Sequence, residues 1–154
     1  MRIKKINKEN AKKIINWKYE PPYDFYNMDD TDESLQELIQ YKGIFDDEEL
    51  IGFYCVGSFA QVPFGREIGS YPEVEGLLDL GFSMKPKLTG QGFGYPFISF
   101  IMDEVEQKYN LNIIRLTVAE FNKRAIAAYK KLGFATQTSF IANDTAFLVM
   151  VKNL

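Results

Sequence analysis

The stretch from Val74 to Tyr109 constrains the fold more than any other part of the sequence. Apolar residues alternate through Val74–Met84, which predicts a β-strand with one apolar side. Pro86 ends this strand, and the segment Thr89–Gly94 that follows has a glycine at every second position. A helical stripe of apolar residues then extends to about Tyr109. A strand that leads into a helix through so short a turn predicts a mixed α/β chain.

The glycines of this turn suit an anionic ligand. Residues without a Cβ let the backbone bend tightly and let a ligand reach the amides. The next helix directs unpaired N–H groups and its positive dipole end at the same place. A phosphate or pyrophosphate is therefore the expected ligand, and a flexible turn that only caps the helix is the alternative. The Walker pattern is absent, and the dinucleotide pattern fails because Tyr95 and Phe97 stand where its last glycine would.

The rest of the chain also alternates short strands and helices. Asn7 is expected to cap a first helix, and Asp30 with Glu33 forms a capping-box start for a second. The segment 61–72 holds two glycines and two prolines, so we expect a loop there. The other expected elements are strands at Met1–Ile6, Gly43–Phe45, Leu50–Phe59 and Ile113–Val118, a helix from Asn122 to Gly133, and closing antiparallel strands at Phe134–Phe140 and Thr145–Val151.

Composition excludes several classes of protein. The 154 residues carry a net charge of -3, which is unusual for a nucleic-acid binder. The absence of histidine removes Ser-His-Asp and Cys-His catalysis, and the single Cys55 allows no internal disulfide. The N-terminus lacks the apolar core of a signal peptide, and no apolar run is long enough to span a bilayer. We therefore expect a cytoplasmic protein with neither membrane nor nucleic-acid partners.

A second pattern occupies Leu116–Phe134, where a strand, a cap and a short helix end at Gly133. At 3.6 residues per turn, Asn122, Ala125 and Tyr129 share one face of that helix. The small alanine lets a ligand chain or another backbone lie close, with the Tyr129 hydroxyl at its edge. The alternative is a packed core tyrosine, with Asn122 acting only as a helix cap.

Together, the two segments closely resemble the GCN5-related N-acetyltransferase (GNAT) family. The first is D-L-G-F-S-M-K-P-K-L-T-G-Q-G-F-G from Asp79 to Gly94, and the second is N-x-x-A-x-x-x-Y-x-x-x-G-F from Asn122 to Phe134. The first segment is similar to a bacterial subgroup of mostly uncharacterised members. The resemblance implies one domain over residues 1–154 with an α/β (α+β) GNAT fold, in which a twisted mixed sheet of about six to seven strands is flanked by about four helices.

The resemblance also implies acetyl-coenzyme A (acetyl-CoA) as donor, an amine as acceptor and no metal. Tyr129 would donate a proton to the departing thiolate, and Asn122 would lie near the pantetheine arm or order the start of its helix. The family usually has Gln or Arg where this chain has Thr89, whose hydroxyl can donate one hydrogen bond in place of the long side chain. The expected cofactor-binding residues are Phe82, Ser83 and Met84, whose backbone would pair with pantetheine, and Thr89, Gly90, Gln91, Gly92, Phe93 and Gly94 around the pyrophosphate.

The resemblance defines the general base and the acceptor site less sharply. Asp79 is the first candidate for the base, with a surface carboxylate as its alternative role, and Glu75, Glu120 and water are further candidates. Tyr23 and Tyr26 are the expected substrate-binding residues, because aromatic rings followed by carboxylates attract a cationic amine.

Two alternative functions stay open. One is a transferase for a longer acyl-CoA, because the glycine turn recognises the coenzyme and not the acyl group. The other is a non-catalytic acyl-CoA sensor of the same fold.

Relatives that acetylate protein N-termini carry Glu where this chain has Thr117, which favours another amine on a small molecule, a peptide or a protein side chain. Homodimers are common in the family, so a homodimer is a further expectation.

Overall fold

The computed structural model describes residues 1–154, which form seven β-strands and five α-helices joined by loops and short 3₁₀ turns. These elements group into two compact units, neither of which is a continuous stretch of sequence. The first unit comprises Met1–Cys55 and Phe82–Phe100, and the second comprises Val56–Gly81 and Ile101–Leu154. Strand β4 (Leu77–Met84) and helix α4 (Gly94–Lys108) each contribute residues to both units.

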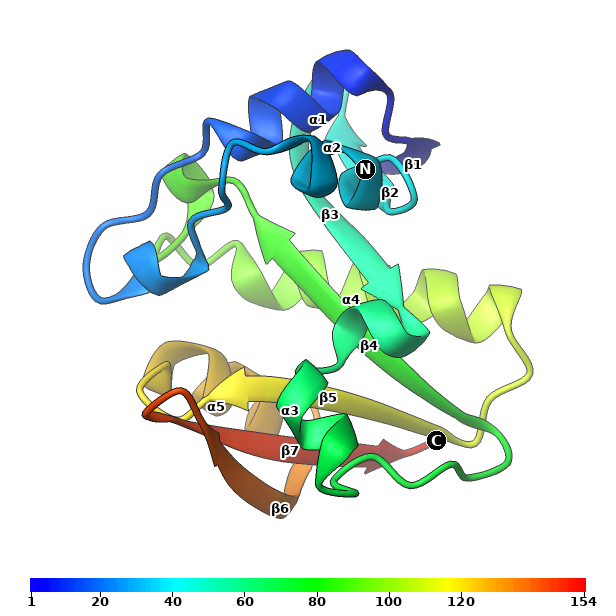
Figure 1. The fold of residues 1–154 in the computed structure, drawn as a ribbon. Helices are drawn as coiled ribbons and strands as arrows, with labels where there is room; N and C mark the ends of the chain where they lie inside the picture. The colour runs from blue at the N-terminus through cyan, green and yellow to red at the C-terminus, as the bar shows by residue number, and fades with distance from the viewer. The chain divides into compact units, whose positions relative to one another are not determined.

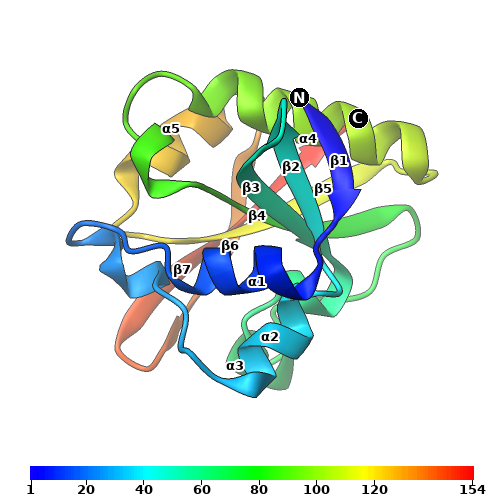
Figure 2. The same cartoon turned by 90° about the horizontal axis from the view of Figure 1, so that it is seen from above.

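The first unit is built around three antiparallel strands. Strand β1 (Arg2–Lys5) pairs with β2 (Lys42–Asp46), and β2 pairs with β3 (Glu49–Val56) after a tight turn. Helices α1 (Lys8–Ile15) and α2 (Asp32–Leu38) contact each other on one face of these strands. The start of α4 lies on the opposite face (Figures 1 and 2).

Gly52 and Phe53 are neighbours in β3 and face opposite sides of the strand. Phe53 stacks on Trp17, which follows α1, with the ring centroids 6.3 Å apart. Gly52 points the opposite way, because side-chain directions alternate along a strand. A Cβ at Gly52 would stand 2.5 Å from the Phe97 ring of α4 and 2.6 Å from the carbonyl oxygen of Ser83 in β4. The missing side chain therefore lets α4 and β4 approach β3 closely.

The second unit contains a four-stranded mixed sheet. Strand β4 runs parallel to β5 (Ile113–Ala119), and their register covers Leu77–Asp79. Strand β5 is antiparallel to β7 (Thr145–Asn153), which is antiparallel to β6 (Ala135–Ala142). Read through β4, the order of the seven strands is β1-β2-β3-β4-β5-β7-β6.

Two helices cover opposite faces of the sheet in the second unit (Figures 1 and 2). Helix α3 (Pro63–Glu67) packs against β6 through Gly65, whose Cβ would lie 2.8 Å from the Phe140 ring. Helix α5 (Lys123–Lys131) lies on the other face and ends before Gly133, which has a φ of 99°. A glycine in this left-handed conformation is a common helix terminator, as the sequence pattern predicts.

Most expected elements are confirmed. The side chain of Asn7 accepts a hydrogen bond from the N–H of Asn10 at 2.8 Å and so caps α1. The two closing strands are antiparallel, and the sheet has seven strands. Strand β3 ends and β4 begins a few residues inside the expected limits, where Gly57 and Gly76 adopt φ values of 71° and 76°. These left-handed residues interrupt the extended backbone at both places.

Two sequence-based expectations are wrong. The cap of α2 is Thr31 and not Asp30, because the residue directly before the first helical turn is the one whose oxygen reaches the N–H of Ser34, at 3.1 Å. The segment expected to be a loop contains the short helix α3. Its start at Pro63 is explained by the fixed φ of proline, which favours the first helical position. This helix also raises the total to five rather than about four.

We expect Gly52→Ala to destabilise the protein by about 1–3 kcal/mol, because the new Cβ would overlap a ring and a backbone carbonyl that cannot rotate away. Urea unfolding followed by circular dichroism measures this change. Gly94→Ala is the matched control, because a Cβ there meets nothing within 4 Å. Its stability should stay within about 0.5 kcal/mol of the wild type. Equal stabilities of the two variants would contradict the close approach at β3.

Candidate functional site

The end of β4 directs backbone groups away from β3. The N–H of Lys85 donates to the carbonyl of Ile51 at 2.7 Å and therefore points toward β3. The carbonyl of Met84 belongs to the same trans peptide, so it points away from β3. Because backbone groups alternate along a strand, those of Phe82 and Met84 face away from β3 and those of Ser83 face it. Phe82 and Met84 thus define one edge of β4.

The glycine turn that follows is held by its own hydrogen bonds. The hydroxyl of Thr89 donates to the carbonyl of Pro86 at 2.7 Å, and the side-chain amide of Gln91 donates to the carbonyl of Lys87 at 2.6 Å. Both bonds turn these side chains back onto the short 3₁₀ turn Pro86–Leu88. The hydroxyl proton of Thr89, expected to be a donor for a ligand, is therefore used inside the turn.

Two glycines give this turn its shape. Gly90 and Gly92 have φ values of 71° and 84°, in the left-handed region that side chains with a Cβ disfavour. A Cβ added at Gly92 or at Gly94 would meet nothing within 4 Å. Gly94 is also the first residue of α4, whose first-turn N–H groups have no acceptor inside the helix. The turn therefore has the form of a backbone site for phosphate.

The lysine between β4 and the glycine turn is ion-paired. The ammonium of Lys85 lies 2.8 Å from the carboxylate of Glu49 in β3. This hydrogen bond, together with the positive charge of Lys85, lowers the pKa of Glu49. The charge of Lys85 is therefore shared with a carboxylate of the first unit and not left to the glycine turn alone.

Asn122 and Tyr129 belong to the second unit. The side-chain oxygen of Asn122 accepts a hydrogen bond from the N–H of Ala125 at 3.2 Å and caps α5. Tyr129 is 9 % exposed, and its ring makes an edge contact with the Phe134 ring at 6.2 Å between centroids. The expected capping role of Asn122 is thus present. Its contact with the coenzyme and the acid role of Tyr129 stay predictions.

Asp79 is buried in an ion pair with Arg115, its partner in the parallel register of β4 and β5. The guanidinium donates to both carboxylate oxygens, at 2.6 and 2.8 Å, and the side-chain amide of Gln61 donates to one of them at 2.8 Å. Arg115 also donates to the carbonyl of Pro72 at 2.9 Å and lies over the ring of Tyr71. The network fastens the segment around α3 to the sheet.

This pairing argues against Asp79 as the general base. A proton taken from an amine would have to displace a bidentate guanidinium from a buried carboxylate, which removes the countercharge of Arg115. We interpret Asp79 as a structural residue. The sequence does carry a signal for this role, since one charged residue stands in each of two apolar strands, and buried charges occur in pairs.

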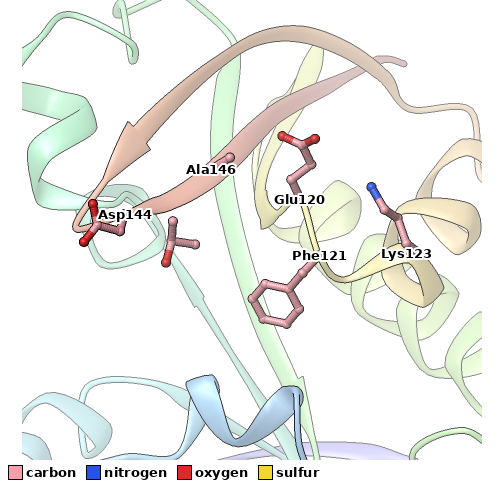
Figure 3. Close-up of a pocket in the computed structure, with 6 residues that line it drawn as sticks. Glu120, Phe121, Lys123, Asp144 and Ala146 are labelled. Atoms are coloured by element: carbon pink, nitrogen blue, oxygen red, sulfur yellow. The ribbon is translucent and has the colours of Figure 1, made fainter.

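A surface pocket of about 300 Å³ lies beside the Asn122 cap in the second unit (Figure 3). The carboxylate of Glu120 reaches it from the end of β5, and that of Asp144 from the turn between β6 and β7 (Figure 3). Sequence reasoning named Glu120 but missed Asp144, which only the folded hairpin brings to the same pocket. The lining residues are Glu120, Phe121, Lys123, Asp144, Thr145 and Ala146.

The expected substrate residues Tyr23 and Tyr26 lie together in one 3₁₀ turn of the first unit. The rings of Phe25 and Tyr26 are in edge contact, with their centroids 5.2 Å apart. Tyr19, to which sequence reasoning gave no specific role, connects this region to β4, because its hydroxyl donates to the carbonyl of Met84 at 2.7 Å. Burial raises the pKa of Tyr19 to about 12, so the hydroxyl keeps its proton at neutral pH.

The sequence from residue 6 to residue 134 matches the model of the acetyltransferase (GNAT) family. The chain therefore belongs to the GNAT acetyltransferases, and the resemblance carried by its two motifs is confirmed. A comparison with curated proteins finds no match. None of the helices combines the length and the apolar character that crossing a membrane requires.

The fold of this chain is shared by many solved structures, among them the following three. An uncharacterised protein from Bacillus halodurans has a TM-score of 0.78 at 20% identity, over 98% of this chain and 82% of that one. A spermidine N-acetyltransferase chimera from Vibrio cholerae and hSSAT has a TM-score of 0.72 at 18% identity, over 99% and 94%. AAC(6')-Ib in complex with ribostamycin and coenzyme A has a TM-score of 0.74 at 16% identity, over 98% and 92%.

We expect Asp79→Asn to destabilise the fold by about 3–5 kcal/mol, because it leaves the buried guanidinium of Arg115 without a countercharge. Chemical unfolding of the variant measures the loss. The double variant Asp79→Leu/Arg115→Met removes both charges and should recover most of the stability. An Asp79→Asn protein as stable as the wild type but devoid of acetyl transfer would instead restore Asp79 as the base.

Proposed function

We propose that this chain transfers an acetyl group from acetyl-CoA to a primary amine of a small cationic acceptor. The observation that carries the proposal is the glycine turn Thr89–Gly94, in which Gly90 and Gly92 have φ values of 71° and 84° and Gly94 begins α4. A Cβ added at Gly92 or Gly94 would meet nothing within 4 Å, so the backbone there is open to a ligand. The turn lies inside the region that matches the family. Structures with this fold include AAC(6')-Ib complexes that contain coenzyme A or acetyl-CoA, which supports the same donor here.

The end of β4 suits the pantetheine part of the donor. The register of β4 with β5 covers Leu77–Asp79, and Phe82 and Met84 lie beyond it with their backbone groups turned away from β3. A ligand chain that carries amides can pair with such an edge as an added strand does. Ser83 turns its backbone toward β3, so we assign the pairing to Phe82 and Met84.

The reaction needs one attack and two proton transfers. The neutral amine attacks the thioester carbonyl, so that a C–N bond forms and the C–S bond breaks. We assign to Tyr129 the proton that neutralises the departing thiolate, while the amine nitrogen releases a proton to water, from which the tyrosine recovers its own. The products are the N-acetylated amine and coenzyme A with a free thiol. The packing of Tyr129 against Phe134 gives the phenol a fixed orientation for this step.

Each unit, taken by itself, carries groups that favour a cationic acceptor. Glu120 and Asp144 bring two carboxylates to the pocket that also contains the Phe121 ring. Tyr23 and Tyr26 offer aromatic faces in the first unit. Carboxylates and aromatic faces attract amines that carry more than one positive charge. Spermidine and aminoglycosides, which appear in the names of the fold neighbours, are amines of this kind.

Titration calorimetry with acetyl-CoA, followed by thiol release with polyamines, aminoglycosides and peptide amines, tests the proposal. We expect one-site binding and release with at least one cationic amine. Tyr129→Phe should keep the Kd for acetyl-CoA and lower kcat by about 10²–10⁴-fold, because only the proton donor is lost. Binding without release from any amine would favour the acyl-CoA sensor, and the absence of binding would refute the assignment of the glycine turn.

The acceptor pocket has its own test. Glu120→Gln/Asp144→Asn should raise KM for a polyamine by about two- to thirtyfold at low salt, since each of the two exposed charge pairs contributes about 0.2–1 kcal/mol. Lys123→Gln is the matched control on the same pocket, and it should leave KM unchanged or lower it. Steady-state kinetics at two salt concentrations measures both effects. Equal KM values for both variants and the wild type would exclude the pocket from acceptor binding.

A further inference from the structure

We propose that Tyr19 is a positioning residue that couples the aromatic loop, defined as residues 17–31, to acetyl-CoA bound along the edge of β4. Figure 1 shows this loop beside the end of β4, within the first unit. The inference rests on the proposed function, because it requires the coenzyme to use that edge. It assigns to Tyr19 no contact with the reacting atoms.

The hydroxyl of Tyr19 occupies the same edge that we assign to pantetheine. It donates to the carbonyl of Met84 at 2.7 Å. That carbonyl points away from β3, because the N–H of the same peptide, on Lys85, donates to Ile51 of β3. Tyr19 therefore uses one of the two lone pairs of the last carbonyl on this edge. We assign to the coenzyme the N–H of Met84 and the backbone groups of Phe82.

The backbone of Tyr19 is also the point around which the aromatic loop closes. Its N–H donates to the side-chain oxygen of Asn27 at 2.8 Å. The N–H of Asn27 in turn donates to the carbonyl of Asp24 at 3.0 Å, and the N–H of Tyr23 donates to that of Glu20 at 2.8 Å. Tyr19 thus connects the hydrogen bonds inside the loop to β4, the strand to which we assign the coenzyme.

The aromatic loop and the coenzyme are coupled because both use backbone groups of Met84. Its N–H is assigned to the coenzyme and its carbonyl accepts from Tyr19, so a ligand that fixes Met84 also fixes the anchor of the loop. By thermodynamic linkage, a loop anchored through Tyr19 must favour the coenzyme by the same factor. The pKa of Tyr19, raised to about 12 by burial, keeps the hydroxyl a donor over the pH range of an assay.

Hydrogen exchange followed by mass spectrometry tests this coupling in the wild type and in Tyr19→Phe, each with and without acetyl-CoA. Without ligand, we expect amides of residues 19–27 to exchange about two- to tenfold faster in Tyr19→Phe, the effect of one neutral hydrogen bond. Acetyl-CoA should slow exchange of these amides in the wild type and not in the variant. Tyr109→Phe, which removes a phenol hydroxyl from the second unit, is the matched control and should behave as the wild type.

Amides of residues 89–94 report coenzyme binding independently of the aromatic loop. If acetyl-CoA protects them but residues 19–27 respond alike in the wild type and Tyr19→Phe, the coupling is refuted while the proposed function stands. Unchanged exchange of residues 19–27 in the free variant also refutes it. If acetyl-CoA protects neither segment in the wild type, the proposed function fails and the coupling fails with it. Asn27→Ala, which breaks the loop at its other bond, should reproduce the faster exchange even where Tyr19→Phe folds poorly.

Discussion

The ion pair between Asp79 and Arg115 fixes the point at which the parallel register of β4 and β5 ends. The two residues form the last pair of that register, and both are buried. A slip by one position would set each charge against apolar neighbours, so the pair holds the alignment of the strands. Phe82 and Met84 follow this pair in the same strand, beyond the residues that are in register with β5. The same guanidinium also secures the chain around α3 through the carbonyl of Pro72.

The parts of the fold that were predictable from the sequence depend on local chemistry. The alternation in β4, the stop at Pro86 and the cap at Asn7 each involve residues within a few positions of one another. Helix α3 was not predicted because the two glycines and two prolines of the segment 61–72 locally favour a loop. The partners of Asp79 and Tyr19 could not be identified from the sequence, because Arg115 lies 36 residues from Asp79 and Met84 lies 65 residues from Tyr19.

The candidate site divides recognition between backbone and side chains. The proposed coenzyme contacts come from backbone groups at the end of β4 and in the glycine turn, where sequence matters chiefly through the absence of a Cβ. The proposed acceptor contacts come from side chains such as those of Glu120 and Asp144, which can change without disturbing the sheet. This division is compatible with a fold that persists between chains of 16–20% identity.

Thr89 stands where the family usually has a long side chain. Here its hydroxyl stabilises the turn by donating a hydrogen bond to the carbonyl of Pro86. A flexible arginine or glutamine would lose its rotamer freedom each time the ligand bound. This loss of conformational entropy costs up to about 2 kcal/mol of binding free energy. The bonds of Thr89 and Gln91 to the preceding 3₁₀ turn are instead formed once, when the chain folds. The entropy of ordering this loop is therefore lost during folding, and the free protein already has the shape that we propose for phosphate binding.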